Sequence, residues 1–167
     1  MLVNTSHAKD QIENQINQGT LFYNWGKLDN AYAAFKAAEH MLRSQAGLML
    51  HKAVVANNMA TVWRDRQEWV AAESYYQQSI RFYHQIGNQL QLARTMINLA
   101  KCHIQQKAPV AALAQLEKAH DLLEQTPYNK QVQLLRKEIA AQLTHLEPAK
   151  KSDKTASLPL SAPSAAT

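Results

Sequence analysis

The chain has 167 residues, 46% apolar content and a formal net charge of +5, with four glycines and five prolines. This length suits one domain with a real core, and the scarcity of glycine and proline favours long helices over β-turns, so an all-α fold is expected. The single Cys102 excludes an internal disulfide. Residues 1–18 lack a signal-peptide pattern and no window is apolar enough for a membrane span, so we expect a cytoplasmic protein without membrane association.

Apolar residues recur at helical spacing in seven segments that glycine, proline or short polar turns separate. Asp29 and Asn88 are expected to be N-caps, Gly87 a helix stop, Pro109 a first-turn residue and Pro148 a terminator. The expected helices are about 9–25, 29–46, 48–64, 68–85, 88–106, 109–126 and 130–146.

The two ends of the chain have a different composition from its middle. Residues 1–8 are expected to be a flexible N-terminus, and residues 147–167, rich in Ser, Ala, Pro and Lys, a disordered tail. One domain at residues 9–146 remains.

The helices form pairs, and the pairs repeat. Aligning the turn positions Gly26, Gln67 and Lys107 gives spacings of 41 and 40 residues. Residues of similar size then recur at fixed distances from the turn. The small positions are Gly19, Ala60 and Ala100, then Ala31, Ala72 and Ala112, then Ala38, Ser79 and Ala119; the large ones are Phe22, Trp63 and His103, then Phe35, Tyr76 and Leu116. This alternation predicts hairpins that bury their surfaces by stacking.

At these positions the chain resembles the tetratricopeptide repeat family, in three repeats at about 12–43, 53–84 and 93–124 and a capping helix at 130–146. The spacing is similar to that of the family's longer-helix variety. Gln67 and Lys107 depart from the usual turn glycine. The resemblance implies an α-solenoid, a right-handed superhelical array of three antiparallel helical hairpins plus the cap, in which the first helix of each pair lines a concave groove.

An asparagine stands nine positions before each turn residue, at Asn17, Asn58 and Asn98. We call these three residues the asparagine row. The resemblance places the row in the groove, where each carboxamide, with a donor and an acceptor, can bracket a peptide bond of an extended ligand. The alternative is that asparagine is frequent at this position whatever the ligand.

Side chains beside the asparagine row are expected to select the peptide. The repeat alignment places Arg64, Arg94, Lys101, Asn57, Thr61 and Tyr23 in or beside the groove. Three cations favour an acidic segment or a C-terminal carboxylate, although ordinary surface solvation is the alternative. A full carboxylate clamp, as some relatives have, is not expected, because Ile16 and Thr20 stand where its first-repeat lysine and asparagine would be.

No motif for catalysis, a metal or a cofactor is visible, and the seven histidines lack metal-ligand spacing. Trp63, Trp69 and His103 are interpreted as core residues. Nucleic acid is disfavoured as a partner because no basic stripe interleaves with aromatic residues. A non-enzymatic adaptor or co-chaperone without a cofactor, binding an acidic protein or peptide, is therefore expected. The alternative is a structural or regulatory subunit, or a self-associating scaffold, with an idle groove.

Overall fold

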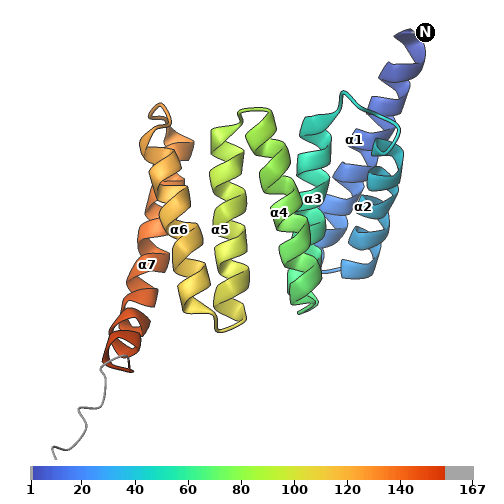
Figure 1. Ribbon diagram of the computed structural model, residues 1–167. Helices are drawn as coiled ribbons and strands as arrows, with labels where there is room; N and C mark the ends of the chain where they lie inside the picture. Colours follow the sequence, from blue (N-terminus) through green and yellow to red (C-terminus); the bar gives the residue numbers. More distant parts are fainter. Residues whose placement is uncertain (1, 157–167) are drawn as a thin grey trace, which may run out of the picture.

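The computed structural model describes residues 2–156, with side chains described for residues 6–146. These residues form helices and connecting turns without any strand, as Figure 1 shows. In chain order the helices are α1 (Leu2–Asn24), α2 (Leu28–Leu42), α3 (Met49–Asp65), α4 (Trp69–Gln85), α5 (Gln89–Gln105), α6 (Pro109–Glu124) and α7 (Lys130–Ala156). The all-α prediction is confirmed.

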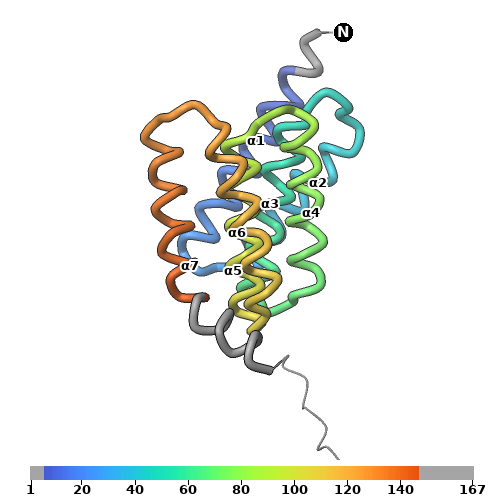
Figure 2. Tube along the Cα trace, turned by 60° about the vertical axis from the view of Figure 1, so that its left-hand side comes forward, coloured from blue at the N-terminus to red at the C-terminus, as the bar shows by residue number. Residues whose placement is uncertain are grey.

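The helices stack as three antiparallel hairpins in a row. The most extensive contacts join α1 to α2, α3 to α4 and α5 to α6, and α7 covers the last hairpin by contacting both α5 and α6. Figure 2 turns the molecule so that the α7 end of the row comes forward. The architecture is the expected α-solenoid of three hairpins and a terminal helix.

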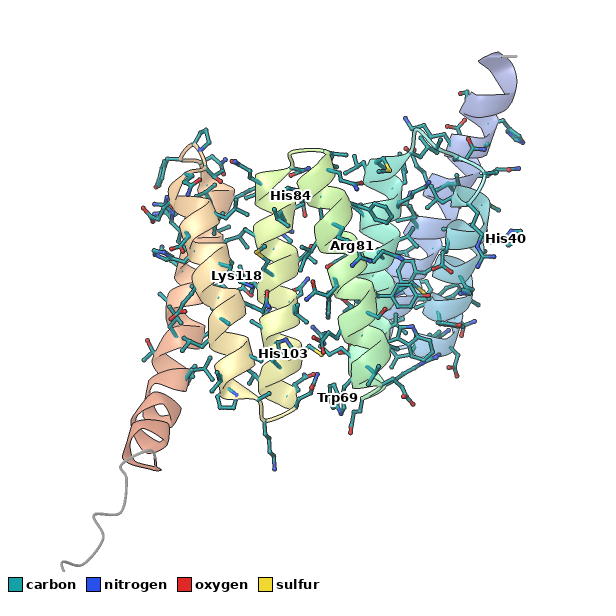
Figure 3. All side chains as sticks on the ribbon, viewed as in Figure 1. His40, Trp69, Arg81, His84, His103 and Lys118 are labelled. Atoms are coloured by element: carbon teal, nitrogen blue, oxygen red, sulfur yellow. The ribbon has the colours of Figure 1, made fainter. Side chains whose placement is uncertain are left out.

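Every small position predicted from the repeat alignment is buried, and so are Phe35, Tyr76 and Leu116. Of the three large residues before the turns, His103 is 6% exposed, whereas Phe22 and Trp63 are half-buried and pack against the core. His103 is thus a core residue on α5, as expected (Figure 3). The repeat pattern therefore predicts the core correctly, because stacking requires the same sizes at each crossing.

The turns inside the three hairpins share one backbone geometry. Gly26, Gln67 and Lys107 all have positive φ, at 71°, 62° and 58°. In the first turn the Gly26 N–H donates to the Tyr23 carbonyl and the Lys27 N–H to the Phe22 carbonyl, and the other two turns repeat this pattern. These paired bonds form a Schellman motif, which places a left-handed residue directly after the helix. Gln67 and Lys107 adopt this conformation without glycine.

Gly19 of α1 packs against the Phe35 ring of α2. A Cβ added at Gly19 would lie 2.5 Å from the Phe35 ring, which is itself buried. We expect Gly19→Ala to lower the free energy of unfolding by about 1–3 kcal/mol, since overpacking outweighs the better helix propensity of alanine. Urea unfolding measures this, with Ala33→Gly on the exposed side of α2 as a propensity control. A more stable Gly19→Ala protein would contradict this close packing.

Three details of the helix ends differ from the expected ones. The cap of α2 is Lys27 rather than Asp29, whose carboxylate lies in the first turn and accepts from Arg66. Helix α1 begins at Leu2 rather than residue 9, and α7 continues through Pro148 to Ala156. Proline removes one backbone hydrogen bond, and the alanines and lysines that follow favour a helix. The division into a domain at 9–146 with flexible ends stays a prediction, and residues 157–167 lie outside the described residues.

The two layers of helices differ in spacing. The backbones of α1, α3, α5 and α7 approach one another in turn, whereas in the described part of the chain the backbones of α2, α4 and α6 lie farther apart. Because the closer layer is the inside of a curved row, α1, α3, α5 and α7 form the inner face, and α2, α4 and α6 form the outer face. No helix within residues 2–156 is long and apolar enough to cross a membrane.

Candidate functional site

Polar side chains of neighbouring repeats meet on the inner face. The Asn98 Nδ2 donates to Asn57 Oδ1 at 3.2 Å, which joins α5 to α3. Asn58 is half-buried and forms no hydrogen bond within the described residues, and Asn17 is exposed. The structure thus leaves the side chains of Asn17 and Asn58 open, while one amide hydrogen of Asn98 is already used.

An apolar pocket of about 210 Å³ lies beside Asn17, between α1 and α3. Ile16, Leu50 and Val54 provide its apolar lining. At its edge His51 Nε2 and Glu13 Oε1 lie 3.0 Å apart, and this hydrogen bond is the main cause that lowers the pKa of Glu13. The pocket can take an apolar side chain at the N-terminal end of the asparagine row.

Arg64 and Tyr23, both expected beside the groove, are joined to Asp65. The Arg64 Nε donates to Asp65 Oδ1 at 2.8 Å, and the Tyr23 hydroxyl donates to Asp65 Oδ2 at 2.6 Å. The Arg64 side chain is 13% exposed. Its charge is therefore balanced within the chain, and this cluster also fastens the end of α1 to the end of α3.

The other expected groove residues fall into two groups. Lys101 forms an ion pair with Glu138 of α7, and the Thr61 hydroxyl donates to the Asn57 carbonyl at 3.0 Å and lies 3.2 Å from the Tyr76 hydroxyl. Arg94, in contrast, is exposed and forms no ion pair with any described acid. Among the three predicted cations, Arg94 has the charge most available to a ligand.

The apolar pocket and the inner-face acids were missed from the sequence. The repeat alignment could have indicated some of these residues. One repeat position, thirteen residues before each turn residue and one helical turn before the asparagine row, is occupied by Glu13, Val54 and Arg94. The inner face accordingly carries an acid on α1, an apolar side chain on α3 and a cation on α5 at one level.

Burial of two tyrosines predicts loss of stability at alkaline pH. Burial, aided by Asp65, raises the pKa of Tyr23 from 10.0 to about 12, and burial raises that of Tyr83 to about 12 against the opposing charge of Arg94. A folded pKa above the unfolded value means that the stabilisation is complete below pH 10 and is lost as pH rises toward 12. We expect tyrosinate absorbance to show Tyr23 and Tyr83 among the late-ionising groups, together with Tyr75 and Tyr76, whose pKa burial also raises, and one late-ionising group fewer in Tyr83→Phe. Complete ionisation of the folded protein by pH 11 would contradict this.

Residues 52–125 match the family model of the tetratricopeptide repeat. These residues form tetratricopeptide repeats. Among solved structures, this chain is similar to the N-terminal domain of stress-induced protein-1 (STI-1) from C. elegans, with a TM-score of 0.58 and 12% identity over 80% of this chain and 97% of that one. It is also similar to BtubC (BKLC) from P. vanneervenii, with a TM-score of 0.63 and 16% identity over 89% of this chain and 66% of that one. No curated protein sequence matches.

The tetratricopeptide repeats at residues 52–125 are a protein–protein interaction module. Stacked repeats of this kind present extended concave surfaces to their partners. Within residues 6–146, no group of three or more His, Cys, Asp or Glu side chains is placed to hold a metal ion.

Proposed function

We propose that the protein binds an extended peptide segment of a partner protein along its inner face, between α1 and α5. The observation that carries this proposal is the apolar pocket next to Asn17, at the start of a row that continues through Asn58 to Asn98. An apolar anchor beside backbone-binding amides is the arrangement that holds an extended chain, since pockets give specificity and main-chain hydrogen bonds give affinity.

The asparagine row supplies the contacts to the peptide backbone. Asn58 has its acceptor and both amide hydrogens available, because it forms no hydrogen bond within the described residues. Asn98 keeps its carbonyl oxygen and one amide hydrogen after donating to Asn57. The Asn57–Asn98 bond fixes α3 against α5, so the row is ordered before a ligand arrives and less entropy is lost on binding.

Arg94 selects a ligand with an acidic group and fixes the direction in which the peptide lies along the groove. Arg64 and Lys101 are neutralised by Asp65 and Glu138, and Glu13 and His51 border the other end of the groove. An acidic side chain or terminal carboxylate of the peptide therefore pairs with Arg94 on α5, and its apolar side chain enters the pocket between α1 and α3. Such a protein acts as a cytoplasmic, non-enzymatic adaptor or co-chaperone that requires no cofactor.

Selection from a random peptide library on the immobilised protein tests the proposal. We expect enriched peptides to contain one large apolar residue and, separated from it, an acidic residue or a free C-terminus. A Val54→Glu protein should fail to enrich them, because it places a carboxylate in the pocket, while Val70→Glu, at an exposed position on α4, should enrich the same set. Enrichment that Val54→Glu leaves unchanged would refute an inner-face site.

A further inference from the structure

A second pocket lies on the opposite side of α3, between two helices of the outer face. It has a volume of about 250 Å³ and is lined by α2, α3 and α4. It exists because the backbones of α2 and α4 stay apart in the described part of the chain and a side-chain hydrogen bond from Tyr75 to Glu39 bridges them, so α3 is left as the floor between them. Val55 and Ala56 form this floor, whereas Leu50 and Val54 line the inner-face pocket from the other side of α3.

The interior of this outer pocket is apolar. Leu42 of α2 and Phe82 of α4 line it together with Val55 and Ala56. Phe82 is half-buried, so part of its ring is open to the pocket, whereas Leu42 is 3% exposed. A space of this volume is well above the roughly 30 Å³ that one water occupies in the liquid, and it suits a branched or aromatic side chain.

The rim of the outer pocket is positively charged. Arg43 and Lys52 border it, and neither forms an ion pair with a described acid. Glu39 also borders it, but its two carboxylate oxygens are engaged, with Lys36 Nζ at 2.7 Å and with the Tyr75 hydroxyl at 3.1 Å. The charge that remains for a ligand is therefore cationic, and the Gln78 amide adds a neutral donor and acceptor.

We propose that the outer pocket is a second binding site, which receives a large apolar side chain of a partner protein whose neighbouring residues are acidic. The apolar lining of Leu42, Val55, Ala56 and Phe82 takes the side chain, and Arg43 and Lys52 pair with the flanking carboxylates. Charge complementarity selects this occupant, because a basic segment would be repelled by the rim. This site is separate from the inner-face groove and does not depend on it. With both faces occupied, one molecule can join two partner segments.

A short synthetic peptide tests this site directly. The probe is an acetylated and amidated peptide with phenylalanine between two aspartates, and two controls carry lysines in place of the aspartates or alanine in place of phenylalanine. We expect the acidic probe to shift the backbone amide signals of Val55, Ala56 and Gln78 in NMR spectra of the full chain, with at least tenfold higher affinity than either control. Equal affinity of the three peptides, or shifts confined to the inner face, would overturn the proposal.

Matched variants separate this site from the groove and from general charge. Arg43→Glu with Lys52→Glu should weaken the probe at least tenfold, whereas Lys118→Glu with Lys130→Glu makes the same change of charge at exposed positions away from the pocket and should leave it unchanged. Lys118 lies on α6, as Figure 3 shows. Asn58→Ala with Arg94→Glu, which disables the groove, should also leave the probe unchanged. Weakening by the Lys118 and Lys130 pair, or shifts at Val55 and Ala56 with single-stranded DNA but not with the probe, would contradict the proposal.

Discussion

Replacing Tyr76 by alanine should lower the free energy of unfolding by about 3–5 kcal/mol, the usual cost of removing a buried aromatic side chain. Tyr76 is 0% exposed and packs with Ala60, Ala72 and Leu99, so it fills the junction between the second and third repeats. Because the stability of a repeat array depends on the interfaces between neighbours, a cavity at this junction weakens the coupling of the two halves. Urea unfolding followed by circular dichroism measures the loss.

Two control variants separate packing from the tyrosine hydroxyl. Tyr76→Phe removes only the hydrogen bond with Thr61 and should cost about 0.5–1.5 kcal/mol. Tyr128→Ala removes a side chain that is 70% exposed and should change stability by less than about 0.5 kcal/mol. A Tyr76→Ala protein as stable as Tyr128→Ala would show that this junction is not packed as described.

Combining Asn58→Ala with Arg94→Glu should weaken a library-selected peptide by about 30-fold or more. The variant loses one neutral hydrogen bond to the peptide, about 0.5–1.5 kcal/mol of binding free energy, and one charge-assisted hydrogen bond, about 1.5–3 kcal/mol. Each 1.4 kcal/mol, roughly, lowers the affinity tenfold. Neither side chain is needed for folding by any described contact, since Asn58 is unbonded and Arg94 is exposed. Calorimetric titration measures the change.

The matched control for the groove variant makes the same two substitutions elsewhere. Asn30→Ala with Arg81→Glu changes an exposed asparagine on α2 and an exposed arginine on α4, and it should bind the peptide like the wild type. Figure 3 shows Arg81 on α4, in the outer layer of helices. Equal weakening by the two double variants would mean that net charge, rather than the inner face, controls binding.

The core could be predicted from the sequence because each position occurs in three repeats and the residue sizes can be compared among them. A small residue at Gly19 alone has many explanations, but the same size at Ala60 and Ala100 indicates a helix crossing, and all three are buried. The positions of the turns were predictable in the same way, since Gln67 and Lys107 align with Gly26 and share its positive φ. Two helix ends were not: the cap of α2 is Lys27, which precedes the better capping side chain of Asp29, and α7 continues past Pro148, which has no equivalent in another repeat.

The sequence could not show which cations of the inner face are paired within the chain, for a physical reason. Lys101 pairs with Glu138 on the next inner helix, and Arg64 pairs with its own neighbour Asp65 beneath Tyr23. These contacts depend on side-chain rotamers and on the distance between helices that are about 40 residues apart in sequence. A count of charged residues therefore overstates the positive charge that is available to a ligand. The pockets were missed because each is formed by residues of different repeats whose side chains fail to fill the space between helices.

The most direct measurement of peptide binding on the inner face is an NMR titration of the ¹⁵N-labelled protein with a library-selected peptide, observing the side-chain amide signals of asparagine. We expect saturable shifts for Asn17, Asn58 and Asn98, which form the row, and unchanged signals for Asn30 and Asn129, which lie outside it. Shifts of Asn30 or Asn129 with an undisturbed row would contradict peptide binding on the inner face.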